Sequence, residues 1–186
     1  CASVWGKNLI TDEQAQEVFE QAYSLGIRYF DTGYSYGCAE ERIGKILKTS
    51  KIVKREDIII STKVGTKKVN GKYIHDFTPA WMKHSVTTSL KRMGIHYVDL
   101  LLVHGPQVAD LTDAYLNAMR KLKEEGIAKA IGINTFDTDV IEFVCKTKCF
   151  DFVMLDYNIL KQEREPIIEQ LYQSGIGVIA GAPWAE

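Results

Sequence analysis

The chain has 186 residues, of which 46% are apolar, and 23 basic against 24 acidic residues leave a formal net charge of -1. This length and apolar content predict one globular domain over residues 1–186 with a substantial core. The balanced charge gives no global field that favours nucleic acid or an anionic membrane, and no apolar run is long enough to span a bilayer.

The four cysteines have neither the density nor the spacing of a disulfide framework, and no signal peptide is visible. We therefore expect reduced thiols in a cytoplasmic protein. Cys145 and Cys149 are four residues apart in a predicted helix but have no further ligands nearby, so we expect no metal site. Because the first residue is Cys rather than Met, we expect that the natural start of the protein is absent.

Amphipathic stretches that end in a Gly-Ile pair recur along the chain. The first, residues 11–25, begins with Thr11 and Gln14 in the spacing of a capping box, which predicts a helix. Another helix is expected to begin at Thr78 and Pro79, a capping residue followed by a proline suited to the first turn. A glycine just after a helix supplies a left-handed cap, so each Gly-Ile pair predicts a helix-to-strand corner. The pairs begin at Gly26, Gly94, Gly126 and Gly175.

Short runs rich in Ile, Val and Leu lie between these helices. They are almost continuously apolar rather than alternating, which is typical of parallel strands covered on both faces. Strands and helices that alternate along a chain indicate an α/β architecture. The predicted strands are residues 28–30, 58–62, 98–103, 130–133, 152–155 and 178–180, with one further strand near residues 2–5.

Polar residues stand where the predicted strands end. Polar groups at the ends of five strands predict a ring of site residues, which is how a (β/α)8 TIM barrel builds its site. An open doubly wound sheet would concentrate its site at one switch point, and no Gly-x-Gly-x-x-Gly follows any strand to support a Rossmann cofactor site. We therefore predict a (β/α)8 barrel. The polar residues are Asp31, Lys63, His104, Asn134 and the run Asp156-Tyr157-Asn158.

The segment FDTGYSYG, residues 30–37, adds two phenols to a strand-end carboxylate. Taken singly, Asp31 is typical of a turn, Lys63 of a solvated strand end, and the tyrosines of packing aromatics. Together they fit one mechanism, because a phenol can protonate a carbonyl oxygen when a nearby ammonium stabilises the phenolate. Lys63 would supply that ammonium and Asp31 would keep it charged. His104 would orient the carbonyl or share the proton transfer.

Five segments resemble the successive signature segments of the aldo-keto reductases, in the family's order. The resemblance covers the chain from about Trp5 to its last residues. It implies a (β/α)8 barrel and hydride transfer from a nicotinamide cofactor, usually NADPH with NADH not excluded, to a small-molecule aldehyde or ketone. It implies no metal. The segments are GIRYFDTGYSYG, IIISTKVG, SLKRMGIHYVDLLLVHGP, GIAKAIGINTF and FVMLDYNIL.

The resemblance also implies the roles of the catalytic residues. Tyr36 stands five residues after the strand-end Asp and directly before Gly, and becomes the general acid. Asp31 and Lys63 become the pair that tunes it, and His104 becomes the residue that orients the substrate. The loop residues without an assigned role are Tyr34 and Ser35.

On the cofactor side, Asn134 and Thr135 stand where the resemblance implies bonding to the nicotinamide carboxamide, and Tyr157 where an aromatic ring stacks on the nicotinamide. Trp5 is the loosest match and would line the substrate pocket. The family commonly has Ser-Asn in place of Asn134-Thr135, and Gln in place of Met154. Because Met154 cannot replace an amide, we expect carboxamide binding to be weaker or arranged differently.

The chain ends just after the predicted strand in GVIAGAPWAE. A (β/α)8 barrel usually needs ~250 residues, and its phosphate site commonly lies on the loops after strands seven and eight. We therefore expect a truncated single barrel domain with about seven strands. The eighth strand and the C-terminal helices, which would complete the cofactor site, are expected to be missing.

Two other interpretations stay open. The altered carboxamide positions and the missing end would also suit a binding or regulatory subunit that keeps the reductase barrel with little or no turnover. Lys63 could instead form a Schiff base, as in barrel aldolases, but an aldolase leaves the spacing of Asp31 and Tyr36 unexplained.

Overall fold

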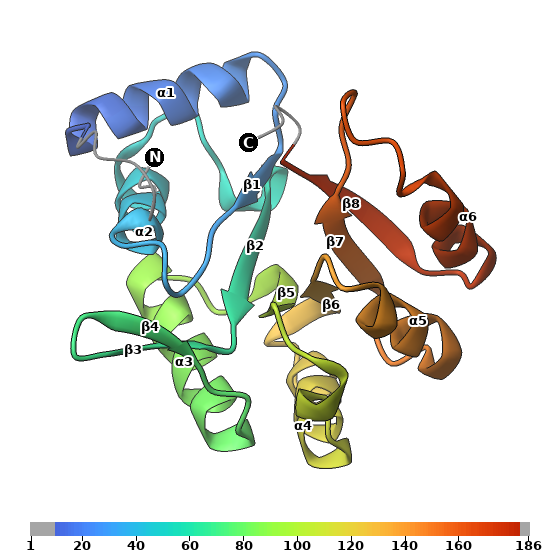
Figure 1. Cartoon of the computed structure of the whole chain (residues 1–186). Helices are drawn as coiled ribbons and strands as arrows, with labels where there is room; N and C mark the ends of the chain where they lie inside the picture. Colours follow the sequence, from blue (N-terminus) through green and yellow to red (C-terminus); the bar gives the residue numbers. More distant parts are fainter. Residues whose placement is uncertain (1–9, 183–186) are drawn as a thin grey trace.

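The computed structural model describes residues 10–182, and its central feature is a curled sheet of six parallel strands. The strands lie in the order β1-β2-β5-β6-β7-β8, so β1 and β8 form the two edges of the described sheet. The curl makes this sheet part of a (β/α)8 barrel, as the sequence predicts (Figure 1). The strands are Tyr29–Asp31 (β1), Ile59–Val64 (β2), Val98–His104 (β5), Ala128–Asn134 (β6), Phe152–Asp156 (β7) and Gly177–Gly181 (β8).

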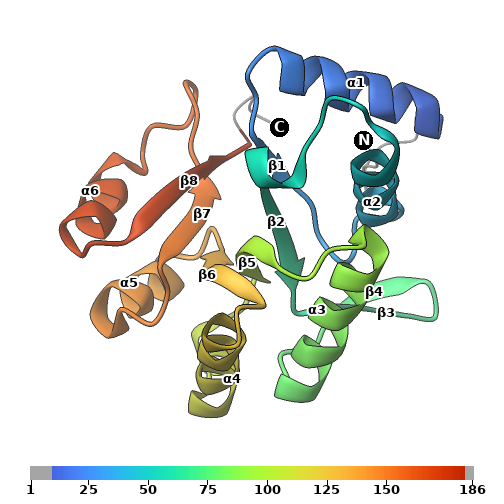
Figure 2. The same ribbon diagram turned by 180° about the vertical axis from the view of Figure 1, so that it is seen from behind.

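Helices surround the outer side of the curled sheet, as the views from front and back show (Figure 1 and Figure 2). Each strand of the sheet from β1 to β7 is followed by a helix before the next strand of the sheet begins. The helices are Asp12–Ser24 (α1), Ala39–Thr49 (α2), Pro79–Met93 (α3), Asp113–Glu124 (α4), Thr138–Thr147 (α5) and Glu165–Gln173 (α6), with short 3-10 helices at Arg55–Asp57 and Val108–Asp110.

The two helix starts that capping residues predict are confirmed. Thr11 and Gln14 form a reciprocal capping box, in which each backbone N–H donates to the other side chain at 2.9 and 3.2 Å. Thr78 accepts from the backbone N–H of Trp81 at 3.2 Å, and Pro79 begins α3. The glycines of the four Gly-Ile corners all have positive φ, between 63° and 93°. Each therefore ends its helix in the left-handed conformation that favours glycine.

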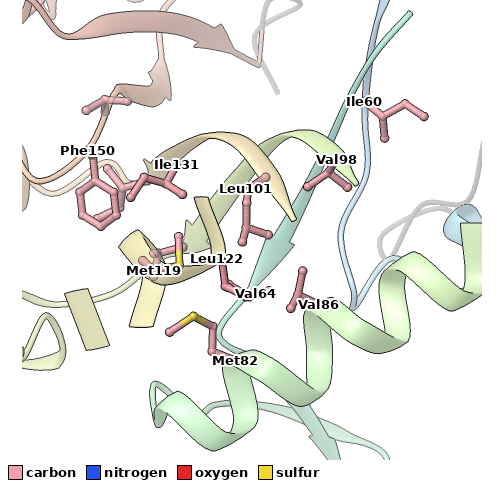
Figure 3. Packing of buried hydrophobic residues seen from close by; sticks show 14 of the residues in the cluster. Ile60, Val64, Met82, Val86, Val98, Leu101, Met119, Leu122, Ile131 and Phe150 are labelled. Carbon is pink, nitrogen blue, oxygen red and sulfur yellow. The ribbon is translucent and has the colours of Figure 1, made fainter. Parts of the chain in front are cut away.

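Apolar side chains fill the layer between the sheet and the helices. Figure 3 shows Ile60 of β2, Leu101 of β5 and Val86 of α3 in this layer, all of them buried. A second, smaller cluster is built around Leu102 and Phe152. Neighbouring residues of a strand point to opposite faces, so Leu101 and Leu102 are buried on opposite sides of the sheet. This burial on both faces explains why the strands are almost continuously apolar in sequence.

A two-stranded antiparallel hairpin between β2 and α3 is an addition that the sequence analysis does not predict. It consists of β3 (Thr66–Val69) and β4 (Lys72–His75). Its turn is formed by Asn70 and Gly71, with φ of 49° and 81°. Asn-Gly is the preferred pair for a tight hairpin turn in which both central residues have positive φ. The strand expected near residues 2–5, and Trp5 within it, lie outside the described residues.

Candidate active site

The carboxyl ends of the parallel strands bring the predicted polar residues to one rim of the sheet. Asp31 ends β1 and pairs in register with Ser61, two residues before Lys63 in β2. His104 ends β5 and lies directly beside Asn134, the last residue of β6. Because all these strands run in the same direction, their last residues meet at the same edge. The expected grouping of side chains is therefore present in the structure.

Lys63 and Asp31 form an ion pair inside this rim. The Lys63 side chain is only 2% exposed, and its ammonium donates to Asp31 Oδ2 and, at 2.9 Å, to the carbonyl oxygen of Thr32. The second carboxylate oxygen, Oδ1, accepts from the hydroxyl of Ser61 at 2.5 Å, and Ser61 Oγ lies 2.9 Å from the hydroxyl of Tyr29. Both oxygens of Asp31 are therefore held, which compensates the burial of the ammonium.

Tyr36 lies on top of this ion pair. Lys63 Nζ is 4.6 Å from the centroid of the Tyr36 ring, and the ring meets that of His104 edge to face with centroids 6.1 Å apart. Gly33 makes room for the ring, because a Cβ at this position would be 3.3 Å from the nearest ring atoms. Gly37, by contrast, has a φ of 60°, so it provides the bend after Tyr36.

The loop that carries Tyr36 is held to α3 by an ion pair with a buried carboxylate, which the sequence analysis does not identify. Arg92 of α3 donates to Glu40 at 3.0 Å and to the carbonyl oxygen of Tyr34 at 3.1 Å. Glu40 is buried and also accepts from the hydroxyl of Thr62 at 2.7 Å. Partial burial lowers the pKa of Arg92, but the hydrogen bond and charge of Glu40 outweigh it and raise that pKa above its ordinary value. The carbonyl oxygen of Tyr34 thus holds the loop against α3.

His104 is held as a neutral imidazole. Its Nδ1 lies 3.2 Å from the hydroxyl of Thr66, the first residue of β3. Burial, reinforced by the nearby charge of Lys63, lowers the pKa of His104 to about 4. Near pH 7 the ring therefore carries no charge, and it can orient a ligand through a hydrogen bond but holds no extra proton to transfer.

A pocket of about 400 Å³ opens beside Tyr36 and His104. Its wall combines imidazoles, phenols, hydroxyls and an amide with the exposed ring of Phe136, and none of its lining residues is acidic. Six of the ten lining residues have no role in the sequence analysis. Three of the six belong to the β3–β4 hairpin, which the Asn70-Gly71 turn could have revealed. The lining residues are Ser35, Tyr36, Thr66, Tyr73, His75, His104, Gly105, Asn134, Thr135 and Phe136.

Of the three residues expected to hold a cofactor, two line this pocket. Asn134 Nδ2 donates to the carbonyl oxygen of Met154 at 3.3 Å, which fixes the plane of its amide. Thr135 is buried, and its hydroxyl accepts from the backbone N–H of Asp137 at 3.1 Å. Tyr157 is half-buried and is not part of the pocket wall. Its phenol donates to Glu165 at 3.1 Å, and this hydrogen bond raises its pKa.

Asp156, another polar residue at a strand end, supports the loop after β7. It pairs with Lys161 at 3.0 Å and with Arg164 at 3.1 Å. Burial opposes ionisation of Asp156, but these two cations outweigh it and lower its pKa. Arg164 in turn donates to the carbonyl oxygen of Phe136 at 2.8 Å, which connects this loop to the pocket wall.

Across residues 10–182, no three His, Cys, Asp or Glu side chains are grouped closely enough to bind a metal ion. In the same part of the chain, no helix has both the length and the apolar character that a membrane span needs. Three free cysteines are described, Cys38, Cys145 and Cys149.

Comparisons with known proteins give one consistent result. The model of the aldo/keto reductase family matches residues 2–186. An uncharacterized oxidoreductase of Bacillus subtilis, YqkF, is 30% identical over 93% of this chain and 56% of its own length. The L-galactose dehydrogenase of Arabidopsis thaliana is also 30% identical, over 98% of this chain and 58% of its own length.

The solved structures agree with this result. The holo form of an aldo-keto reductase from Bacillus halodurans superposes with a TM-score of 0.83 at 31% identity, over 91% of this chain and 57% of that one. The chain thus spans a little more than half the length of the relatives that it matches.

Proposed function

The chain belongs to the aldo/keto reductase family, and from that premise we propose that this protein reduces a small aldehyde or ketone with a nicotinamide cofactor. The observation that carries the proposal is the position of Tyr36 between an open pocket and an ion pair whose lysine is buried. Lys63, paired with Asp31, lies 4.6 Å from the Tyr36 ring centroid, and the same ring lines the pocket. A phenol beside a fixed ammonium is suited to donate a proton to a carbonyl oxygen.

Tyr36 is the proton donor in this proposal. When its proton moves to the carbonyl oxygen, negative charge develops on the phenol, and the ammonium of Lys63 stabilises that charge. Asp31 pairs with the ammonium of Lys63, whose side chain is almost fully buried. The hydroxyl of Ser61 holds the carboxylate from the opposite side, at 2.5 Å. These contacts fix the ammonium before the substrate arrives, which is the preorganisation that such catalysis needs.

His104 orients the carbonyl in this proposal. It is neutral near pH 7, because burial lowers its pKa to about 4. The hydroxyl of Thr66 can donate to Nδ1 at 3.2 Å, and the ring proton then lies on Nε2. An Nε2–H beside Tyr36 would donate to the same carbonyl oxygen that Tyr36 protonates. Two donors at one oxygen fix the direction of the carbonyl group.

A nicotinamide bound at this rim would supply the hydride, with NADPH as the cofactor we favour and NADH as its alternative. The residues present fit a nicotinamide, because an amide and a hydroxyl line the pocket next to Tyr36. We assign Asn134 and Thr135 to the carboxamide, which needs both donors and acceptors. We assign the ring of Tyr157 to stacking on the nicotinamide. The hydrogen bond to Glu165 uses only the hydroxyl of Tyr157, so the face of the ring stays available for stacking.

The wall of the pocket favours a hydroxylated carbonyl compound as the substrate. Its imidazoles, phenols and hydroxyls both donate and accept hydrogen bonds, as the hydroxyl groups of a sugar do. One relative of this chain is named for its action on a sugar, L-galactose. We therefore propose small hydroxyaldehydes as the substrate class.

A Schiff-base mechanism at Lys63 has less support. An amine that attacks a carbonyl must be neutral and free. The ammonium of Lys63 instead donates to Asp31 and to the carbonyl oxygen of Thr32, so its nitrogen is engaged with two acceptors. We therefore assign Lys63 to charge stabilisation.

The test is cofactor consumption with a panel of small aldehydes, for the unmodified protein and for Tyr36→Phe. The variant keeps the ring but lacks the acidic proton, so we expect its kcat to fall by at least about 100-fold. Tyr34→Phe is the matched control, because it removes the phenol of a neighbouring tyrosine that does not line the pocket. Full activity of Tyr36→Phe would exclude Tyr36 as the donor. Tight cofactor binding without turnover of any aldehyde would instead favour a binding or regulatory subunit.

A further inference from the structure

The β3–β4 hairpin stands at the carboxyl end of β2 (Figure 1). Residues of this hairpin form part of the pocket wall. Only Gly65 separates β2, which carries Lys63, from the first residue of the hairpin. Three hairpin residues, Thr66, Tyr73 and His75, line the pocket together with Tyr36. The hairpin is therefore a candidate for substrate contacts at a distance from the reacting carbonyl.

One face of the hairpin is directed at the pocket and is polar along its length. In the antiparallel register Thr66 lies opposite His75, and Lys68 lies opposite Tyr73. Residues that face each other, and those two positions along, share one face of a hairpin. The contact of Thr66 with His104 at 3.2 Å shows that this face looks toward the site. The opposite face carries Lys67 and Ile74 at the paired positions.

Several contacts hold the base of the hairpin in place. The backbone N–H of Asp76 donates to the carbonyl oxygen of Gly65 at 2.9 Å, and the indole of Trp81 donates to that of Thr66 at 3.2 Å. The ring of His75 packs on Phe77 with centroids 5.3 Å apart. These contacts position the imidazole of His75 before any ligand binds.

His75 is also close to the strand end that carries His104. A Cβ on Gly105, the residue after His104, would lie 3.5 Å from Cε1 of His75. The two imidazoles thus belong to one wall, with His104 nearer to Tyr36 and His75 on the hairpin. A small substrate whose carbonyl lies at Tyr36 and His104 would share this pocket with His75.

We propose that His75, assisted by Tyr73, binds the hydroxyl groups next to the substrate carbonyl and so makes the hairpin the selective wall of the pocket. The inference rests on the proposed reductase function. An imidazole and a phenol each donate and accept a hydrogen bond, which matches the hydrogen-bonding capacity of a hydroxyl group. A site built for hydroxyl groups discriminates against analogues that lack them, because its polar groups are then left unpaired.

The experiment compares two three-carbon aldehydes, glyceraldehyde and propanal, which differ only in hydroxyl groups. For His75→Ala we expect kcat/KM to fall about tenfold with glyceraldehyde and to change by less than about twofold with propanal. Tyr73→Phe, which removes only a hydroxyl, should give the same selectivity with a smaller loss of about threefold. His75→Gln should recover part of the loss, because its amide also donates and accepts.

His96→Ala is the matched control, because His96 is an exposed histidine just before the start of β5, at the opposite end of the strand from His104. It should leave kcat/KM unchanged for both aldehydes. Thermal unfolding of every variant shows whether the hairpin substitutions disturb the fold. If His75→Ala disturbs it, Tyr73→Phe still tests the proposal.

The outcomes separate the two proposals. An equal loss with both aldehydes, or no loss with glyceraldehyde, would overturn the role of His75 while the reductase function stands. If the unmodified protein reduces neither glyceraldehyde, propanal nor any other aldehyde of the panel, the proposed function itself is wrong and the role of His75 is overturned with it.

Discussion

Removal of the ammonium beneath Tyr36 is the sharpest perturbation of the proposed mechanism. Lys63→Met keeps much of the side-chain volume and removes the charge. With Nζ 4.6 Å from the Tyr36 ring centroid and an effective dielectric constant of about 20, one charge stabilises a phenolate by about 3.5 kcal/mol. If the phenol carries most of this charge in the transition state, kcat of Lys63→Met should fall roughly 400-fold. The measurement is kcat with a saturating aldehyde.

A double-mutant comparison decides whether Lys63 acts through the phenol. In the Tyr36→Phe background no phenolate forms, so Lys63→Met should cost less than about threefold there. Asp31 is left without its cation in both backgrounds, but 32% of its side chain is exposed, so water can solvate the carboxylate. A loss of several hundred-fold in both backgrounds would refute the electrostatic role, and unchanged thermal unfolding excludes a general loss of fold.

Two further predictions concern stability. Because burial lowers the pKa of His104 from an ordinary value of 6.5 to about 4, the unfolded chain binds a proton there that the folded chain does not. The free energy of unfolding should fall by about 2 kcal/mol between pH 7.5 and pH 5, and urea unfolding should show a smaller decrease for His104→Phe. In α2, Gly44→Ala would place a Cβ 2.5 Å from the carbonyl oxygen of Arg92, so urea unfolding should show a loss of about 2 kcal/mol. A gain of about 1 kcal/mol, as for an unobstructed helix glycine, would contradict this close approach of α2 to α3.

The sequence predicts the features of this fold that depend on local patterns. The capping pair Thr11 and Gln14, the Gly-Ile corners and the apolar strands each depend on residues close together in the chain. The polar residues at strand ends are also predictable, because parallel strands must bring their carboxyl ends together. The family resemblance, which the family model confirms over residues 2–186, then gives expected roles to Asp31 and Tyr36.

Contacts between distant residues are not visible in such patterns. Glu40 and Arg92 are 52 positions apart and lie on different helices, and nothing near either residue shows that the carboxylate is buried. The hairpin is a different case. Its strands lack the alternation of apolar and polar residues that is typical of a half-buried sheet. Only the Asn70-Gly71 turn therefore indicates a hairpin in the sequence. The sequence analysis misses the pocket residue His75 for that reason.

The hairpin and the ammonium of Lys63, which supplies the charge in the proposed mechanism, depend on one short segment of the chain. Lys63 lies two residues before Gly65, and Gly65 has a φ of 102° at a point where a Cβ would lie 2.5 Å from the ring of Phe77. The same Phe77 packs on His75. A displacement at this base would therefore move Thr66 away from His104. It would also move the pocket wall that His75 forms, so in the proposed mechanism turnover and substrate choice would change together. Among the described residues, the tip of the hairpin has no such contact with Phe77. In the proposed mechanism, substrate selectivity can therefore change at the tip while Tyr36 and Lys63 stay in place.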